Sequence, residues 1–148
     1  MKPRQYLYLL AADQDFRLLR GSRQDLVEIS HHRADAFPDV QDVFASERNR
    51  GQSPGMSHGV SFGLDDSGRH EAEERRRFAR HALAALQAEW GQGKDAGIVL
   101  VAGPKMLGVL RELMPKGLGA HVTADLAKDL VKVPLHDMPG HLAEVPGV

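Results

Sequence analysis

Cysteine is absent from the 148 residues of this chain, and aromatic residues make up only 5% of them. Without cysteine there is no disulfide framework, no thiolate zinc site and no cysteine nucleophile. No apolar run approaches the length of about 20 residues that a membrane-spanning helix needs. The formal net charge is only −1, which argues against attraction of the whole surface to nucleic acid and leaves a local basic patch open.

The remaining composition is that of an ordinary globular protein, with 42% hydrophobic and 26% charged residues. The length predicts one domain, spanning residues 1–148. The short apolar segment near the start ends at Asp13, and no small-residue cleavage site follows it. We therefore expect a cytoplasmic protein with no membrane partner.

Three short segments at the start of the chain have the pattern of strands. Residues 5–12 form a nearly continuous apolar run, which is typical of a strand buried on both faces. A polar turn separates this run from residues 16–20, and a second turn at 21–24 leads to an alternating segment at 25–30. We predict an antiparallel meander of three strands.

A long amphipathic helix is predicted for residues 71–90. Its apolar positions fall on one face, and they are Phe78, Ala82, Ala85, Leu86 and Trp90. Acidic residues in the first turn suit the helix dipole, and Glu73 and Arg77 are spaced to form an ion pair. Gly91 and Gly93 provide the stop.

The second half of the chain alternates strand and helix patterns. We expect strands at 96–102 and 121–124, and helices at 105–114 and between 135 and 145. The alternating polar pattern at 125–132 does not assign this segment to a particular secondary structure. The fold class is therefore α/β: a mixed β-sheet with an N-terminal antiparallel meander, a long helix and shorter helices packed on it.

Residues 46–70, rich in glycine, serine and arginine, are predicted to form a flexible loop. Glycine permits close approach of the backbone to a partner, and arginine binds anionic groups. The alternative is a disordered surface loop without a role. The candidate RNA- or ribosome-binding residues lie in this loop and at the start of the helix, and they are Arg48, Arg50, Gly51, Gln52, Arg69, His70, Arg75 and Arg76.

The densest basic cluster comprises Arg75–Arg77 and Arg80, with Arg69 just upstream. Arginines near a helix N-terminus can bind phosphates. Glu71, Glu73 and Glu74 lie among them and cancel part of the charge. A solvated, salt-bridged helix face is the alternative interpretation.

Catalytic and metal-binding patterns are weak. Adjacent His31 and His32 point to opposite faces of a strand, and the chain has no His-Glu-x-x-His motif. Turn chemistry explains the aspartates after the first strand, and solvated surface pairing on a helical face explains Asp125 and Asp129. No nucleophile elbow or phosphate-binding loop is present. We predict no catalytic residue, no metal and no cofactor.

The order of these motifs resembles the bacterial proteins named as required for attachment to host cells. The shared features are Ala12-Asp13 after the first strand, a Gly/Ser/Arg-rich middle, Arg77-Phe78-Ala79-Arg80, Pro104 to Arg111, Lys128 to Pro134 and Pro139 to Leu142. The resemblance covers essentially the whole chain.

That family is in turn similar to the central domain of archaeal and eukaryotic peptide-release factors. There, three strands lead to a flexible glycine loop and then to a long helix beginning near Arg-Phe-Ala-Arg. The loop of release factors carries Gly-Gly-Gln, whose backbone donor assists hydrolysis of peptidyl-tRNA. This chain has no Gly-Gly-Gln, and Gly51-Gln52-Ser53 lies further from the predicted helix than the family pattern places it.

Three functions follow from the resemblance. The first is a non-catalytic module that binds the ribosome or tRNA through the Gly/Arg-rich loop. The second is a protein-interaction or regulatory role in attachment to host cells, with other proteins as partners. The third is a peptidyl-tRNA ester hydrolase in which Gln52 orders water.

Overall fold

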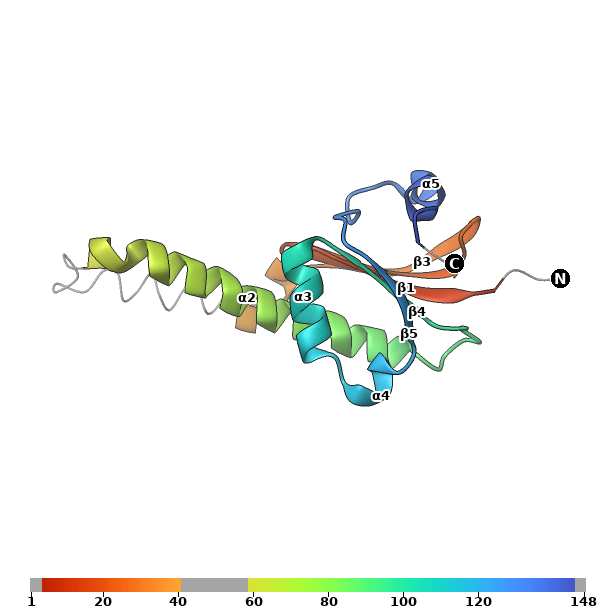
Figure 1. Ribbon diagram of the computed structural model, residues 1–148, viewed down its shortest axis with the longest axis horizontal. Coiled ribbons are helices and arrows are strands. Elements are labelled where there is room, and N and C mark those ends of the chain that lie inside the picture. The colour runs from red at the N-terminus through yellow and green to blue at the C-terminus, as the bar shows by residue number, and fades with distance from the viewer. Residues whose placement is uncertain (1–3, 41–58, 146–148) are drawn as a thin grey trace.

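The computed structural model describes residues 4–40 and 59–145, with side chains at 4–40 and 68–145. Its centre is a five-stranded sheet of order β3-β2-β1-β4-β5 (Figure 1). The strands are β1 (Tyr6–Ala11), β2 (Asp15–Ser22), β3 (Asp25–Arg33), β4 (Ile98–Ala102) and β5 (Val122–Leu126). The first three form the predicted antiparallel meander, and β4 and β5 extend the sheet in parallel to β1. The mixed α/β architecture is confirmed.

The two central strands are apolar along their whole length because both of their faces are covered. All residues of β1 and β4 are buried. The hairpin between β2 and β3 depends on Gly21, whose φ of 141° suits glycine. A Cβ atom on Gly21 would lie 2.0 Å from the carbonyl oxygen of Asp25, so no other residue fits without displacing the backbone.

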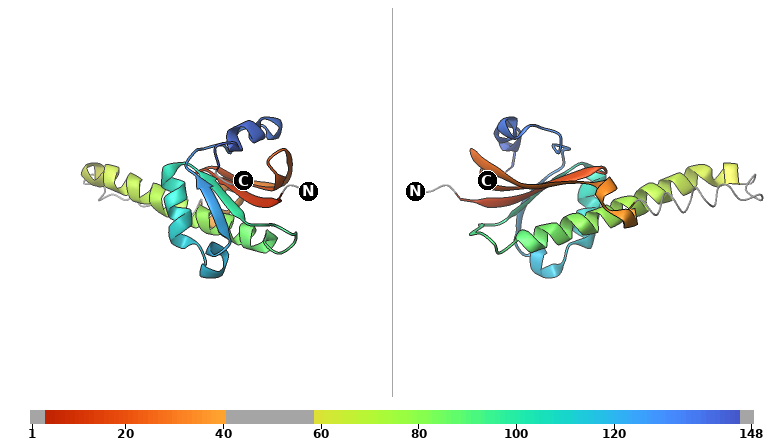
Figure 2. Two further views of the ribbon diagram at one scale, coloured as in Figure 1. Left: turned by 45° about the vertical axis from the view of Figure 1, so that its right-hand side comes forward. Right: turned by 180° about the vertical axis from the view of Figure 1, so that it is seen from behind.

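Helices cover the two faces unequally (Figure 2). One face packs against α2 (Gly59–Glu89), α3 (Pro104–Leu113) and α4 (Lys116–Gly119). The opposite face packs against the C-terminal segment, which contains η3 (Leu135–Asp137) and α5 (Met138–Leu142). A short 3-10 helix, η1 (Ala34–Ala36), follows β3. Phe78 of α2 and Met138 of α5 are both fully buried, one on each side of the sheet.

Helix α2 begins at Gly59, twelve residues before the predicted start at Glu71. The predicted loop is therefore wrong for residues 59–70, and its first part, 46–58, lies outside the described residues. At about 1.5 Å per residue, α2 is about 46 Å long. Figure 1 shows its N-terminal half extending well beyond the sheet. The sequence of residues 59–70 has no clear apolar stripe at helical spacing, which explains why periodicity did not detect this part of the helix.

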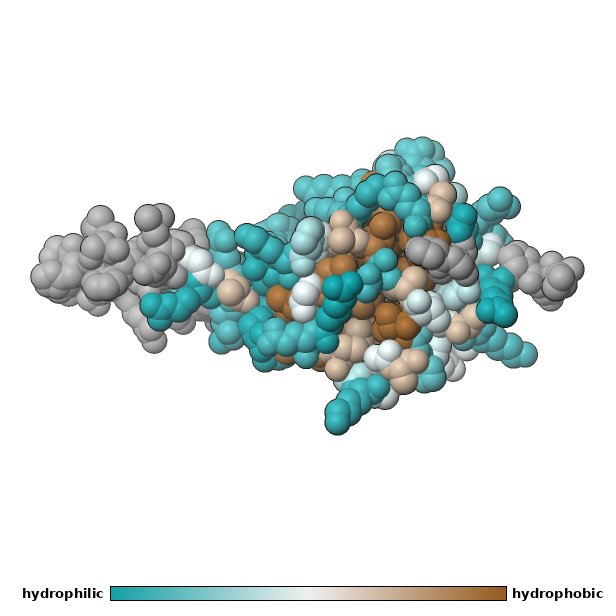
Figure 3. Space-filling model, viewed as in Figure 1, coloured by the Kyte–Doolittle hydropathy of each residue, from teal (hydrophilic) through white to brown (hydrophobic). Residues whose placement is uncertain are grey.

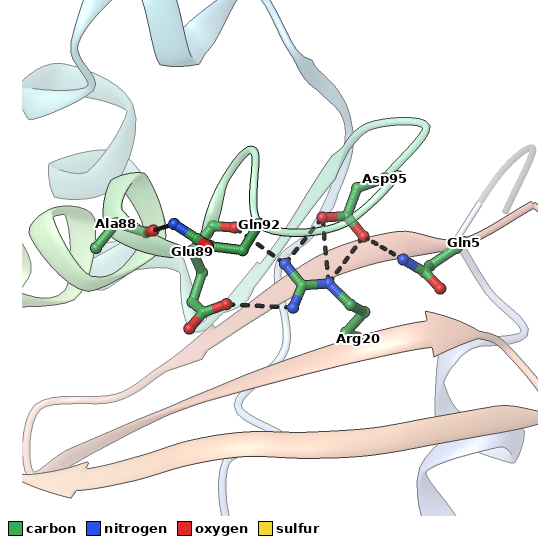
Figure 4. Close-up of polar contacts among 6 residues, drawn as sticks. All are labelled: Gln5, Arg20, Ala88, Glu89, Gln92 and Asp95. Atoms are coloured by element: carbon green, nitrogen blue, oxygen red, sulfur yellow. Dashed lines mark hydrogen bonds and ion pairs between the residues drawn. The ribbon is translucent and has the colours of Figure 1, made fainter.

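The other end of α2 is fixed to the body by Arg20 of β2 (Figure 4). The Arg20 guanidinium donates to the backbone carbonyl of Glu89 at 3.0 Å and to its carboxylate at 3.2 Å. It also donates to Asp95, whose side chain is only 1% exposed and accepts a further hydrogen bond from Gln5. Gly91, with a φ of 98°, follows the end of α2, as predicted for a helix stop.

The structure corrects the prediction that Asp125 and Asp129 share a helical face. Asp125 lies on β5 and pairs with Arg111, so it shares no helical face with Asp129. Residues 127–134 contain no helix or strand. Buried Arg17 of β2 holds this segment in place by donating to the carbonyl oxygens of Val131 and Val133, at 3.0 and 2.6 Å.

Candidate nucleic-acid interface

The basic part of α2 lies where the helix leaves the body of the protein. Arg69, Arg76 and Arg80 are spaced by seven and four residues, which places them on one face of the helix. Glu73 falls on the same face and reduces its charge. In Figure 3 the described surface of this part of α2 is mainly hydrophilic, whereas hydrophobic residues gather over the sheet.

Arg75 points to the body of the protein instead of along this face. Its side chain is 11% exposed and donates two hydrogen bonds to the carboxylate of Asp13, each 2.9 Å long. The hydrogen bond that Arg75 donates to Asp13 raises the pKa of Arg75 above its ordinary value, although burial opposes the shift. Arg75 is therefore committed to an internal ion pair, and an external phosphate would have to compete with Asp13.

Two neighbouring arginines form ion pairs nearer the surface. Arg76 donates to Glu112 of α3 at 2.8 Å, and Arg77 forms the predicted pair with Glu73 at 3.1 Å. Arg77 also donates to the backbone carbonyl of Asp39 at 2.7 Å. Such partly exposed pairs contribute little stability, so their guanidinium groups can exchange partners at low cost. This part of α2 is therefore the solvated, salt-bridged helix face that the sequence analysis gave as the alternative.

Arg80 was not among the candidate binding residues, although the basic cluster includes it. It is exposed and forms no hydrogen bond or ion pair with any described residue. Its position relative to Arg69 and Arg76 provides the sequence signal that would have identified it. Arg69 is exposed and His70 is half-buried.

The structure therefore brings together four of the eight candidate residues on one helix: Arg69, His70, Arg75 and Arg76. The other four, Arg48, Arg50, Gly51 and Gln52, lie outside the described residues. No group of three or more His, Asp or Glu side chains in the described ranges is arranged to hold a metal ion.

A crevice of about 530 Å³ lies beside the Asp13–Arg75 pair. It is bordered by the turn after β1, the start of α3 and the C-terminal segment, and its lining includes Asp15, Lys105, Asp129 and Lys132. The sequence analysis placed Asp129 on a solvated helical face and did not single out Lys105. Their convergence depends on contacts distant in sequence, above all those of Arg17 with residues 131 and 133.

The chain matches a known protein family over nearly the whole fold. The model of a family described as bacterial archaeo-eukaryotic release factor family 12 matches residues 7–142, from β1 to α5. The match confirms the resemblance to release factors, whereas a role in attachment to host cells stays a prediction. No curated protein matches the chain. Within the described residues, no helix is both long enough and apolar enough to cross a membrane.

Proposed function

The chain belongs to bacterial archaeo-eukaryotic release factor family 12, and on that basis we propose that it is a non-catalytic, release-factor-like module that binds the ribosome or tRNA. The contact surface is the arginine face of α2, defined as Arg69, Arg76 and Arg80, together with the preceding residues 46–58. The observation that carries the proposal is the extension of α2 beyond the sheet (Figure 1).

The anchoring of α2 suits this role. Arg20 fixes its C-terminal end to β2, and the Asp13–Arg75 pair fixes its middle to the turn after β1. Arg69 lies on the half of α2 that extends beyond this second anchor, whereas Arg76 and Arg80 lie on its other side, beside the body of the protein. The helix therefore presents the three guanidinium groups on one face, where they can reach phosphates without displacing the core.

The absence of Gly-Gly-Gln supports binding without catalysis. Helix α2 continues through residues 59–76, directly upstream of Arg77-Phe78-Ala79-Arg80, where the release-factor pattern has a glycine loop. Gln52 lies seven residues before α2, which is closer to the helix than the sequence analysis assumed. It remains separated from Arg77 by more than four turns of helix.

The proposal is tested by sedimentation of the purified protein with ribosomes. The test variant combines Arg69→Ala, Arg76→Ala and Arg80→Ala. The matched control combines Arg4→Ala, Lys94→Ala and Lys116→Ala, which remove the same charge from exposed positions without a partner among the described residues. We expect the parent and the control to sediment with ribosomes at about 100 mM salt, and the test variant to remain in the supernatant.

Raising the salt concentration should release the parent from the ribosome, because binding displaces counterions from phosphates. Equal sedimentation of the test variant and the control would contradict the assigned surface. A parent that never sediments with ribosomes and does not bind tRNA would contradict the function itself.

A further inference from the structure

The three consecutive arginines at 75–77 of α2 each contact a carboxylate from a different part of the chain. The pairs are Arg75–Asp13, Arg76–Glu112 and Arg77–Glu73. Of these three arginines, only Arg76 belongs to the arginine face of α2. Glu112 therefore occupies a guanidinium group that the proposed function needs for phosphate binding.

The pair between Arg76 and Glu112 joins two helices at the surface. Nη1 of Arg76 lies 2.8 Å from Oε1 of Glu112, and the side chains are 32% and 60% exposed. The hydrogen bond that Arg76 donates to Glu112 raises the pKa of Arg76 above its ordinary value, and the charge of Glu73 adds to the shift. An external anion can reach this pair from solvent, where it competes with the carboxylate of Glu112.

Glu112 does not stabilise its own helix. It lies in the last turn of α3 (Pro104–Leu113), where the helix dipole favours a cation instead of an anion. The adjacent Arg111 pairs with Asp125 of β5. Within the described ranges, Arg76 is the one cation that Glu112 contacts through a hydrogen bond or ion pair. The position of Glu112 is therefore explained by its contact with α2.

The packing of α3 against α2 holds the carboxylate in place. Met106, Leu107 and Leu110 of α3 are buried in the same core as Phe78 of α2. The end of α3 is thereby fixed beside the arginine face, so Glu112 stays close to Arg76 even when an anion displaces it. Rebinding is then intramolecular, and it is favoured by the high effective concentration of the tethered carboxylate.

We propose that Glu112 is an internal competitor for the arginine face: it occupies Arg76 in the free protein and is displaced when a phosphate of ribosomal RNA or tRNA binds there. This inference rests on the proposed function and describes how its contact surface is regulated. A single phosphate gains little by exchanging with Glu112. An RNA strand that also contacts Arg69 and Arg80 presents its next phosphate to Arg76 at a high effective concentration, so the exchange selects for a polyanion.

Glu112→Gln tests the proposal, because it keeps the size of the side chain and removes its charge. Affinity for purified ribosomes, and separately for tRNA, is measured by fluorescence titration at about 100 mM salt. We expect Glu112→Gln to bind about two- to fivefold more tightly than the parent, the range that corresponds to loss of an exposed ion pair. The matched control, Glu144→Gln, removes the same charge from an exposed pair with Lys128 in the C-terminal segment and should keep the parent affinity.

A double-mutant cycle separates competition at Arg76 from a general effect of charge. Arg76→Ala removes the guanidinium group that Glu112 occupies and leaves Arg69 and Arg80 in place. In this background, Glu112→Gln should leave the affinity unchanged, because no guanidinium remains for it to release. Thermal melts without RNA establish that every variant is folded.

Two results would overturn the inference and leave the proposed function standing. The first is equal affinity of Glu112→Gln and the parent. The second is the same gain from Glu112→Gln with and without Arg76, since Glu112 would then act only by repelling RNA. A parent that binds neither ribosomes nor tRNA would contradict the proposed function, and this inference with it.

Discussion

Arg75 and Asp13 lie 62 residues apart in the chain and form a two-pronged ion pair with both hydrogen bonds at 2.9 Å. The pair joins the middle of α2 to the turn after β1, and both residues line the crevice. Arg75 thus belongs to the scaffold that orients α2, although its sequence position suggested a binding residue. The residues of the arginine face lie on both sides of Arg75 along α2.

Asp13→Asn should lower the free energy of unfolding by about 1 kcal/mol, because the pair is bidentate and Arg75 is largely shielded from solvent. Urea denaturation measures the change. Arg80→Ala is the control, since Arg80 has no partner among the described residues, and its effect should stay within about 0.5 kcal/mol. Equal effects of the two substitutions would mean that the pair does not anchor α2.

Arg20→Ala should be much more harmful, with a loss of about 3 kcal/mol, because it leaves the buried carboxylate of Asp95 without its cationic partner. Arg20→Lys should recover only part of the loss, since an ammonium group cannot reproduce the forked contacts with Asp95 and Glu89. Arg33→Ala removes an exposed ion pair with Asp35 and serves as the control in the same denaturation series. A loss below about 1 kcal/mol for Arg20→Ala would contradict the anchoring role.

Glu74→Gln should stabilise the protein at neutral pH. Burial raises the pKa of the Glu74 carboxyl group above its ordinary value, although His70 opposes the shift. The folded state therefore disfavours the ionised form, and this cost disappears as the pH falls through the folded pKa. The stability difference between variant and parent, measured by urea denaturation from pH 7 to pH 3, should shrink toward acid pH.

Asp39→Asn provides a comparison of opposite sign. The hydrogen bond with His81 lowers the pKa of Asp39, and the charges of His81 and Arg77 add to the shift. The ionised form is therefore favoured in the folded state, so the substitution should destabilise the protein at neutral pH. This stabilisation is lost as the pH falls through the folded pKa. Stability changes of the same sign for both variants at neutral pH would contradict these assignments.

Local patterns were sufficient to predict the sheet. The run of residues 5–12 has no polar position because β1 is covered on both faces, and the alternation at 25–30 reflects the exposed edge strand β3. His31 and His32 fall on opposite faces as predicted, since His31 contacts Asp15 and His32 packs near Phe16. These features depend on residues close together in the chain.

The start of α2 and the crevice could not be predicted in the same way. Gly59, Gly63 and Gly68 have low helix propensity, and the sequence of residues 59–70 has no clear apolar stripe at helical spacing. The crevice depends on Arg17 holding residues 131 and 133, a contact across more than a hundred residues. Sequence reasoning identified arginines of α2 as candidates but could not tell which of them an internal carboxylate would occupy.

The salt dependence of ribosome binding tests the central claim most directly. Affinity for purified ribosomes is measured by fluorescence titration from about 50 to 200 mM potassium chloride, and the slope of log K against log salt counts the phosphate contacts. We predict that combined replacement of Arg69, Arg76 and Arg80 by alanine reduces this slope by about 2 to 3, roughly one for each lost contact, while the Arg4, Lys94 and Lys116 control keeps the parent slope. An unchanged slope in the triple arginine variant would contradict docking through this face of α2.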